Sequence, residues 1–459
     1  MGKVMGGKQS SIKDYFLGAE KVPWLAVCFA IVAAETSTLT FISIPGLAYL
    51  TNLNFLQVTL GYLIGRIVIS FVLLPLYFKG DLETAYSFLE SRFGKKTRSV
   101  ASSTFIFTRL AADGVRLFAT AIPIKLMLDV SYPVAILIIA VVTLFYTYSG
   151  GIKGVIWVDA LQMVIYLGGA FIALVLLMEM IPGGVNSVFT NPELASKLQI
   201  FNLNFGENLG SFFSQPYSLI GGILGGAFLS MASHGVDQLV VQRLLATGKL
   251  NSARKALITS GVIVIFQFAL FLFIGVLLFA YYGKLDIKSD EIFPMFILQE
   301  MPVIPAGIII AGLLAAAMST LAGSISSITS ATVYDLLIPN YKKELTDEKK
   351  LNLSKIFTLI WAGVLTLSAI AFMNSSKVVV ELALSIASFT YGALLGTFFL
   401  GIIVKRAEQK AAITGFFAGI VFMTLIITFK LVAWTWFTLI GVIFTVLVGA
   451  IVTKLTKNK

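Results

Sequence analysis

The sequence predicts an all-α, polytopic membrane protein with about twelve transmembrane helices. Of its 459 residues, 58% are hydrophobic and only 12% are charged, and the mean hydropathy is +0.92. This composition is typical of a chain that crosses a membrane many times. Its apolar segments are continuous rather than alternating, which excludes an outer-membrane barrel.

A membrane-spanning helix needs about 20 apolar residues to cross roughly 30 Å of hydrocarbon. Reading the sequence from its beginning, we find twelve windows of this kind. They cover residues 24–50, 54–78, 98–128, 131–149, 154–181, 216–242, 256–282, 303–337, 354–373, 377–404, 411–429 and 432–453.

The placement of the basic residues predicts how these spans are oriented. If the N-terminus is cytoplasmic, most of the 34 Lys and Arg residues fall on the cytoplasmic side. The exceptions are five outer residues (Lys197, Lys284, Lys288, Lys377, Lys430) and four within spans (Arg66, Arg109, Arg116, Lys125). This positive-inside bias predicts a cell (inner) membrane protein with both termini in the cytoplasm. The net charge of +11 therefore orients the chain, and we expect no nucleic-acid partner.

The first span contains a cluster of polar residues at mid-depth, which are Glu35, Thr36, Ser37, Thr38 and Thr40. An ionised carboxylate at this depth costs about 2.5–3.5 kcal/mol or more. Interrupted backbone is tolerated there only where it is buried in protein or lines a wet cavity. The sequence therefore predicts a helix that is broken at residues 36–40, and again at Pro45 and Gly46, with a transport-type binding site at the break.

The sixth span has its own candidate interruption. Two glycine pairs, Gly221-Gly222 and Gly225-Gly226, are followed by Ser230, Ser233 and His234. Interrupted helices in equivalent positions of two five-helix halves indicate an inverted-repeat transporter with its site at the repeat interface. The alternative is that the glycines only allow neighbouring helices to pack closely.

Five stretches resemble the sodium:solute symporter family, which contains bacterial proline, sialic-acid and sugar symporters. They are SSIKDYFLGAEKVPW, TAYSFLESRFG, YSGGIKGVIWVDALQ, DQLVVQRLLA and AAAMSTLAGSISS, in the family's order. The resemblance implies a LeuT-like core of five plus five helices at residues 23–404. A cytoplasmic segment (residues 1–22) would precede this core, and two further helices (residues 405–459) would follow it. Relatives generally carry an extra helix before the first stretch, so either the chain is a twelve-span variant or the sequence begins downstream of the native start.

A dehydrated monovalent cation needs several oxygen ligands. In the eighth span the Ala316 carbonyl and the hydroxyls of Ser319 and Thr320 share one helix face. The resemblance implies a sodium site made by these groups and by the carbonyls of Ala33 and Thr36. The alternative is that both hydroxyls bond to their own helix.

Asp159 lies about one turn inside the fifth span, where an ionisable residue is by default a functional hypothesis. In some relatives the matching aspartate joins serines of the eighth helix to hold a second sodium ion. Here Ala322 and Gly323, which follow Ser319, offer no hydroxyl. We therefore predict one sodium ion, with Asp159 as a cation-coupling residue near Ser319.

Five residues are candidates for contact with the solute. Ser37 and Thr40 align with family positions that touch substrate, and Thr59 follows by rough spacing. Arg116 lies in ADGVRLFA, which is similar to a GARLF stretch of the proline symporters, and could clamp a carboxylate in a bidentate way. Alternatively, Arg116 pairs with Asp113 on the same helix face.

The fifth candidate, His234, is either a packing residue with satisfied hydrogen bonds or a pH sensor or solute hydrogen bonder. Glu35 has three open roles: tuning the cation site, receiving a cationic solute group, or pairing with Arg66 or Lys125.

Together these features predict a sodium-coupled symporter that imports a small polar solute (a carboxylate, sugar or amino-acid-like molecule) by alternating access. The partners we expect are the solute and the lipid bilayer, with no obligate protein partner. One alternative is proton coupling through Asp159 or Glu35. Another is a membrane solute sensor with a separate signalling partner, because no output domain follows the last span. An enzyme is not expected, since no nucleophile–base constellation is present.

Overall fold

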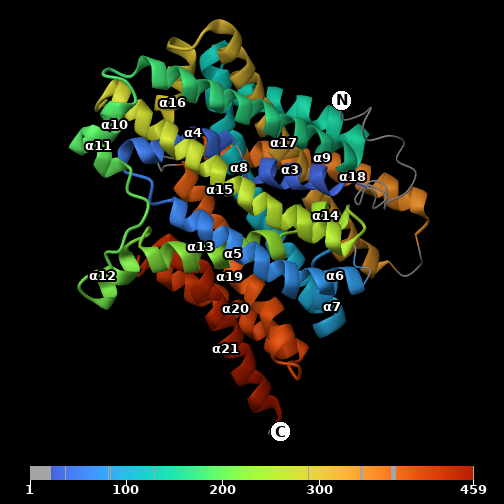
Figure 1. Ribbon diagram of the computed structural model, residues 1–459. Coiled ribbons are helices and arrows are strands. Elements are labelled where there is room, and N and C mark those ends of the chain that lie inside the picture. Colours follow the sequence, from blue (N-terminus) through green and yellow to red (C-terminus); the bar gives the residue numbers. More distant parts are fainter. Residues whose placement is uncertain are drawn as a thin grey trace.

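The computed structural model describes residues 22–36, 38–80, 82, 84–128, 130–287, 289–341, 345–373 and 379–457 (Figure 1). Over these residues the chain forms helices joined by turns and loops, without a strand. The predicted all-α class is therefore confirmed.

The helices are long where the sequence is apolar and short at the two ends of the bundle. In chain order they are α3 (Trp24–Glu35), α4 (Thr38–Leu50), α5 (Leu56–Val72), α6 (Leu74–Lys79), α7 (Ser87–Phe93), α8 (Lys95–Leu128), α9 (Tyr132–Met180), α10 (Asn186–Thr190), α11 (Pro192–Lys197), α12 (Leu209–Ser214), α13 (Leu219–Gly235), α14 (Gln238–Leu245), α15 (Leu250–Tyr282), α16 (Ser289–Gln299), α17 (Val303–Ser330), η2 (Ala331–Leu337), η3 (Ile338–Asn340), α18 (Asp347–Phe372), α19 (Val379–Ile403), α20 (Gln409–Thr428), η4 (Trp434–Trp436) and α21 (Phe437–Lys457).

Eight helices of the described part are long and apolar enough to cross a membrane, and ten spans result when each of two bent pairs counts as one. The predicted window at 98–128 corresponds to α8, which carries several charged residues. The windows at 131–149 and 154–181 form a single helix, α9, of 49 residues. These two spans were predicted as separate elements, and the structure instead continues the helix through the segment between them.

The break in the first span is confirmed. Helix α3 ends at Glu35, and the axes of Trp24–Glu35 and Thr40–Leu50 differ by 56°. The second predicted break is wrong, because α4 runs through Pro45 and Gly46. The Pro-Gly pair serves close packing: a Cβ on Gly46 would lie 2.4 Å from a backbone oxygen of α16, and one on Gly275 of α15 would lie 2.1 Å from the Pro45 oxygen.

The sixth span also bends, but not at its glycines. The axes of α13 and α14 differ by 60°, and the bend lies between them at Val236 and Asp237. There the Asp237 carboxylate accepts a hydrogen bond from the Leu239 N–H at 2.9 Å, which caps the start of α14. Gly222 and Gly226 instead face α5, where a Cβ on Gly226 would lie 2.2 Å from the Val58 backbone oxygen, and Gly221 and Gly225 face η4. The packing alternative therefore accounts for them.

Replacing Gly226 with alanine is expected to lower the unfolding free energy by about 1–3 kcal/mol, because the added methyl group meets backbone that cannot move aside. Thermal unfolding of the purified protein in detergent measures the effect. Gly307→Ala in α17 is the matched control, since no atom lies within 4 Å of its added Cβ. Equal melting temperatures for the two variants would contradict the proposed close packing of α5 and α13.

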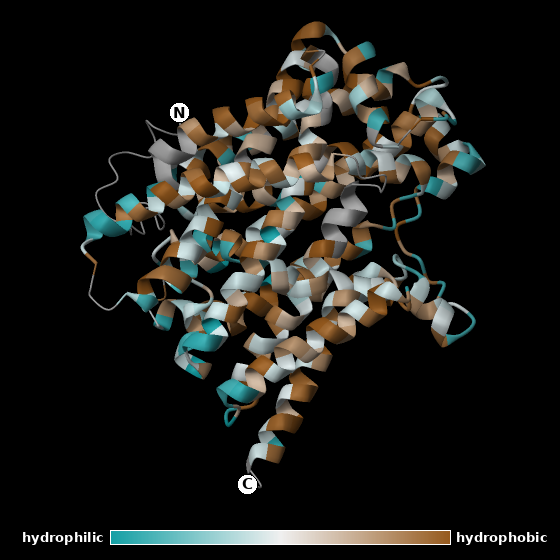
Figure 2. Cartoon of the chain, turned by 180° about the vertical axis from the view of Figure 1, so that it is seen from behind, coloured by the Kyte–Doolittle hydropathy of each residue, from teal (hydrophilic) through white to brown (hydrophobic). Residues whose placement is uncertain are grey.

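Helix α15 packs against α3, α4 and α5, and α5 packs in turn against α13, whereas α20 and α21 lie at one edge with the C-terminus (Figure 1). Hydrophobic residues cover the long helices, and hydrophilic residues gather at helix ends and connecting segments (Figure 2). The interior nevertheless holds buried charged side chains, and six of them lie at or near the two broken helices. These are Arg66, Arg109, Asp113, Asp159, Asp237 and Arg243.

Candidate binding site at the broken helices

The C-terminal end of α3 is the first component of the site. The last intrahelical bond runs from the Thr36 N–H to the Val32 oxygen at 2.9 Å, and Thr36 leaves helical geometry with φ −86° and ψ 72°. The final carbonyls of a helix lack intrahelical donors and carry partial negative charge. This end of α3 is buried, and α3 packs against α9 and α17. The break therefore offers oxygen atoms suited to a cation inside the bundle.

Glu35, the acidic residue at this break, is held by an arginine. Its carboxylate accepts a hydrogen bond from Arg66 of α5, whose side chain is fully buried. The other arm of Arg66 donates to the Ser260 hydroxyl of α15 at 2.7 Å. His234 Nε2 lies 3.8 Å from the same carboxylate oxygen. Of the roles left open for Glu35, the structure shows the pairing with Arg66.

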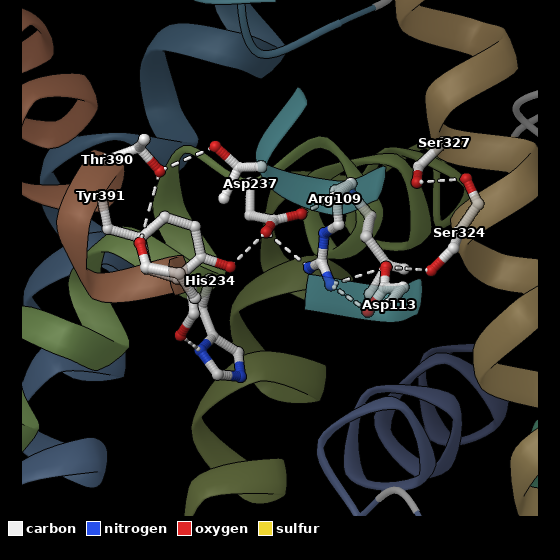
Figure 3. A network of polar contacts seen from close by, with 12 residues as sticks. Arg109, Asp113, His234, Asp237, Ser324, Ser327, Thr390 and Tyr391 are labelled. Atoms are coloured by element: carbon white, nitrogen blue, oxygen red, sulfur yellow. Dashed lines mark hydrogen bonds and ion pairs between the residues drawn. The ribbon is translucent and has the colours of Figure 1, made fainter. Parts of the chain in front are cut away.

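A second group of charged residues lies where α8, α17, α19 and the bend of the sixth span meet (Figure 3). Arg109 of α8 donates to Asp237 at 2.5 Å and to both oxygens of Asp113 at 3.3 Å. The Tyr391 hydroxyl of α19 donates to the same Asp237 oxygen at 2.5 Å. Asp113 also accepts from the Ser324 hydroxyl of α17. We call these five residues the arginine network.

Arg116 adjoins the arginine network through Asp113. Its Nη1 donates to Asp113 Oδ1 at 2.9 Å, as the pairing alternative predicts. The Arg116 side chain is 22% exposed, whereas that of Asp113 is 1% exposed. On α17, Ser324 lies four residues after Thr320, so the two side chains share one helix face. The network therefore ends within about one helical turn of a predicted sodium ligand.

Asp159 does not stand alone in the fifth span. Its Oδ2 accepts from Arg243 of α14, at 2.8 Å from Nη2 and 3.3 Å from Nε, and both side chains are buried. Arg243 also donates to the Leu239 oxygen at 2.7 Å. A Cβ on Gly323 would lie 2.5 Å from Arg243 Nη2, so the guanidinium fills the space that a side chain at position 323 would take.

The structure describes the side chains of three of the five predicted sodium ligands. Thr36 is buried at the end of α3, and its hydroxyl accepts from Gln267 of α15. Ala33 is also buried at that end, and Thr320 is buried in α17. The side chains of Ala316 and Ser319 lie outside the described residues.

The predicted solute residues lie in different surroundings. Ser37 lies outside the described residues. The Thr40 hydroxyl donates to the backbone oxygen of Glu35 at 3.1 Å, directly across the break. Thr59 is buried, and its hydroxyl donates to its own helix at the Leu56 oxygen, 2.8 Å away. The His234 ring is buried, with Nδ1 at 2.8 Å from the Ser233 hydroxyl.

The model of the family described as "Sodium:solute symporter family" matches residues 15–419 of this chain. The chain belongs to the sodium:solute symporter family. It is 28% identical to the sodium/sialic acid symporter NanT of Aliivibrio fischeri, over 100% of this chain and 91% of that protein. Family and relatives are transporters, and this family member is a multi-pass membrane protein that couples sodium to the transport of a small organic solute.

Two solved structures confirm the LeuT-like fold of this symporter. A Na⁺-coupled sialic acid symporter, solved in a substrate-bound, outward-open state, superposes with a TM-score of 0.90 at 27% identity, covering 99% of this chain and 94% of that one. Mhp1, a nucleobase-cation-symport-1 family transporter in a closed conformation, superposes with a TM-score of 0.58 at 13% identity, covering 94% and 92% of the two chains. The second likeness concerns the fold alone.

Sequence reasoning about this symporter missed the partners of its buried charges. The residues not singled out are Asp237, Tyr391, Arg243 and Gln267. Arg243 bonds to Asp159, Gln267 to Thr36 and Asp237 to Arg109, and Tyr391 bonds in turn to Asp237. A usable signal was present. A buried arginine needs an acidic partner, and Asp237 and Arg243 both lie in the DQLVVQRLLA stretch that supports the resemblance.

Proposed function

We propose that this symporter imports a carboxylate-bearing sugar of the sialic-acid class together with one sodium ion, by alternating access. The observation that carries the solute class is the state of Arg116. Among the described residues, its guanidinium has one acceptor, Asp113, while its buried Nε has none. A guanidinium with unused donors, 22% exposed, suits a bidentate carboxylate.

The charges at the first break favour an anionic solute over a cationic one. An ammonium group would need a carboxylate at the break, and Glu35 is already bound by Arg66. The sialic-acid symporters among the relatives transport an acidic sugar, and they cover nearly the full chain. Arg116 would bind the carboxylate, with Ser37, Thr40, Thr59 and His234 toward the rest of the solute.

We propose that the sodium ion lies between the end of α3 and α17. The carbonyls of Ala33 and Thr36 and the Ala316 carbonyl would supply backbone oxygens, with the hydroxyls of Ser319 and Thr320. The negative end of the α3 dipole and the packing of α3 against α17 support this arrangement.

A single sodium ion is supported by the surroundings of Asp159. Arg243 already provides a positive charge to this carboxylate and fills the space beside Gly323. The same ion pair disfavours proton coupling through Asp159, and the pairing with Arg66 disfavours it through Glu35, because each carboxylate already has a permanent positive partner. Asp159 would then act on the cation site through Arg243.

The topology we propose has a ten-helix core at residues 23–404, after a cytoplasmic segment at 1–22, and two additional helices within residues 405–459. Both termini would be cytoplasmic in the inner membrane, as the positive-inside bias predicts.

A sodium titration of the purified protein tests the proposal. With potassium keeping the ionic strength constant, we expect a saturable, sodium-specific rise in melting temperature with a Hill coefficient near one, because a ligand of the native state stabilises it by mass action. N-acetylneuraminate added in sodium should raise the melting temperature further. Ser319→Ala and Thr320→Val should remove the sodium effect.

Thr424→Val is the matched control, because Thr424 is exposed on α20 and donates to its own helix at the Ile420 oxygen. A rise that is the same in potassium would contradict the sodium site. A Hill coefficient near two would contradict the single ion.

A further inference from the structure

We propose that Asp113 is a positioning residue that selects for the charge of the solute: it holds Arg116 while the site is empty and yields it to an incoming carboxylate. This inference rests on the proposed function, since it concerns which carboxylate binds the Arg116 guanidinium. In the structure Arg116 Nη1 donates to Asp113 Oδ1 at 2.9 Å. A solute carboxylate would accept this hydrogen bond in place of Asp113.

Asp113 can release Arg116 without becoming an unpaired buried charge. Arg109 donates to both of its oxygens at 3.3 Å, and the Ser324 hydroxyl donates to Oδ2. These contacts come from α8 and α17 and do not involve Arg116. Releasing one partner of a buried charge is severe only when no other partner remains, and here two remain.

The two partners also differ in mobility. The Asp113 side chain is 1% exposed and is fixed from two helices, whereas the Arg116 side chain is 22% exposed. The arginine is therefore the member of the pair that is free to turn toward a solute. Asp113 stays in place and competes with the solute for the guanidinium.

The net charge of these residues couples solute binding at Arg116 to sodium binding. Arg116, Asp113, Arg109 and Asp237 alternate in sign along the contacts and sum to zero. A carboxylate bound to Arg116 adds one negative charge next to Asp113, which Ser324 of α17 contacts, and Ser324 lies one turn from Thr320. A sodium ion at the proposed site would compensate it, so that the anion and the cation favour each other's binding. A solute without a carboxylate leaves Arg116 on Asp113 and brings no such charge.

The test compares binding of N-acetylneuraminate and of its uncharged methyl ester, in sodium, to the purified protein and to Asp113→Asn. Asparagine keeps the shape but loses the charge that competes for Arg116. We expect the acid to bind about tenfold more tightly to this variant and the ester to bind with unchanged affinity. Asp335→Asn is the matched control, because Asp335 is equally buried and arginine-bound, by Arg98, away from the arginine network. It should change neither affinity.

Ser324→Ala provides a second, milder variant. Without its hydroxyl, Asp113 depends more on Arg116, so the acid should bind severalfold more weakly while the ester is unaffected. Two results would overturn the role of Asp113 and leave the proposed solute class standing. One is an equal change in affinity for the acid and the ester; the other is unchanged affinity for the acid in folded Asp113→Asn and folded Ser324→Ala. If the unmodified protein bound the ester as well as the acid, or did not bind the acid at all, the proposed solute class would fall, and the role of Asp113 with it.

Discussion

Replacing Arg66 with methionine is expected to lower the unfolding free energy by about 3–5 kcal/mol. The substitution leaves the Glu35 carboxylate at the end of α3 without its cation, and the fully buried side chain cannot be replaced by water. It also removes the donor to the Ser260 hydroxyl, which keeps its own bond to the Leu257 oxygen at 2.7 Å. Thermal unfolding of the purified variant in detergent measures this loss.

The double variant Glu35→Gln with Arg66→Met separates the ion pair from the packing. Once both charges are gone, most of the lost stability should return, because the penalty comes from the unpaired carboxylate. Arg254→Met is the matched single variant, since Arg254 donates to the neutral Ser70 oxygen at 2.9 Å. A loss for Arg254→Met as large as that for Arg66→Met would show that burial of the long side chain, rather than pairing with Glu35, is responsible.

Arg109→Met should be at least as damaging, with an expected loss of about 3–5 kcal/mol or more, because one guanidinium serves two buried carboxylates. Asp113 keeps Arg116 and Ser324, but Asp237 keeps only the Tyr391 hydroxyl and the N–H of Leu239 among the described contacts. Since Asp237 caps α14 at the bend, unfolding should begin at this hinge. Chemical or thermal unfolding of the purified variant measures the loss.

The stability loss of Tyr391→Phe is the reference with which the loss of Arg109→Met is compared. It removes one hydrogen bond to the same Asp237 oxygen and should cost roughly 1.5–3 kcal/mol, the range for bonds to charged groups. If Tyr391→Phe were the more damaging of the two variants, the hydroxyl rather than the arginine would be the main support of Asp237.

The fold was predictable from the sequence because apolar length and charge placement are local properties. The polar cluster at Glu35 and Thr36 likewise marked the first break correctly. Pro45 misled, since a proline normally interrupts a helix, but close contacts with α15 and α16 keep α4 continuous there. The bend at Asp237 had a local signal, an acidic N-cap before a helical run, which the neighbouring glycines obscured.

The pairing of buried charges was not predictable in the same way. Glu35 and Arg66 are 31 positions apart, and Arg109 and Asp237 are 128 apart. Which acid meets which arginine depends on how helices cross, and hydropathy carries no information on that. The pairs of Asp113 with Arg109 and Arg116 are the exception, because spacings of four and three on one helix bring these residues together whatever the tertiary structure.

The glycine contacts between α5 and α13 have a consequence for the transport cycle. Gly61 and Gly65 of α5 face backbone oxygens of α13, and Gly222 and Gly226 face α5 in return. With the two backbones meeting directly, there is no layer of flexible side chains over which one helix could slide along the other. We therefore expect α5 and α13 to move together as one rigid body when the site changes its side of access. We expect the breaks at Thr36 and Val236, where α3 and α13 end, to be the places where the backbone bends during this change.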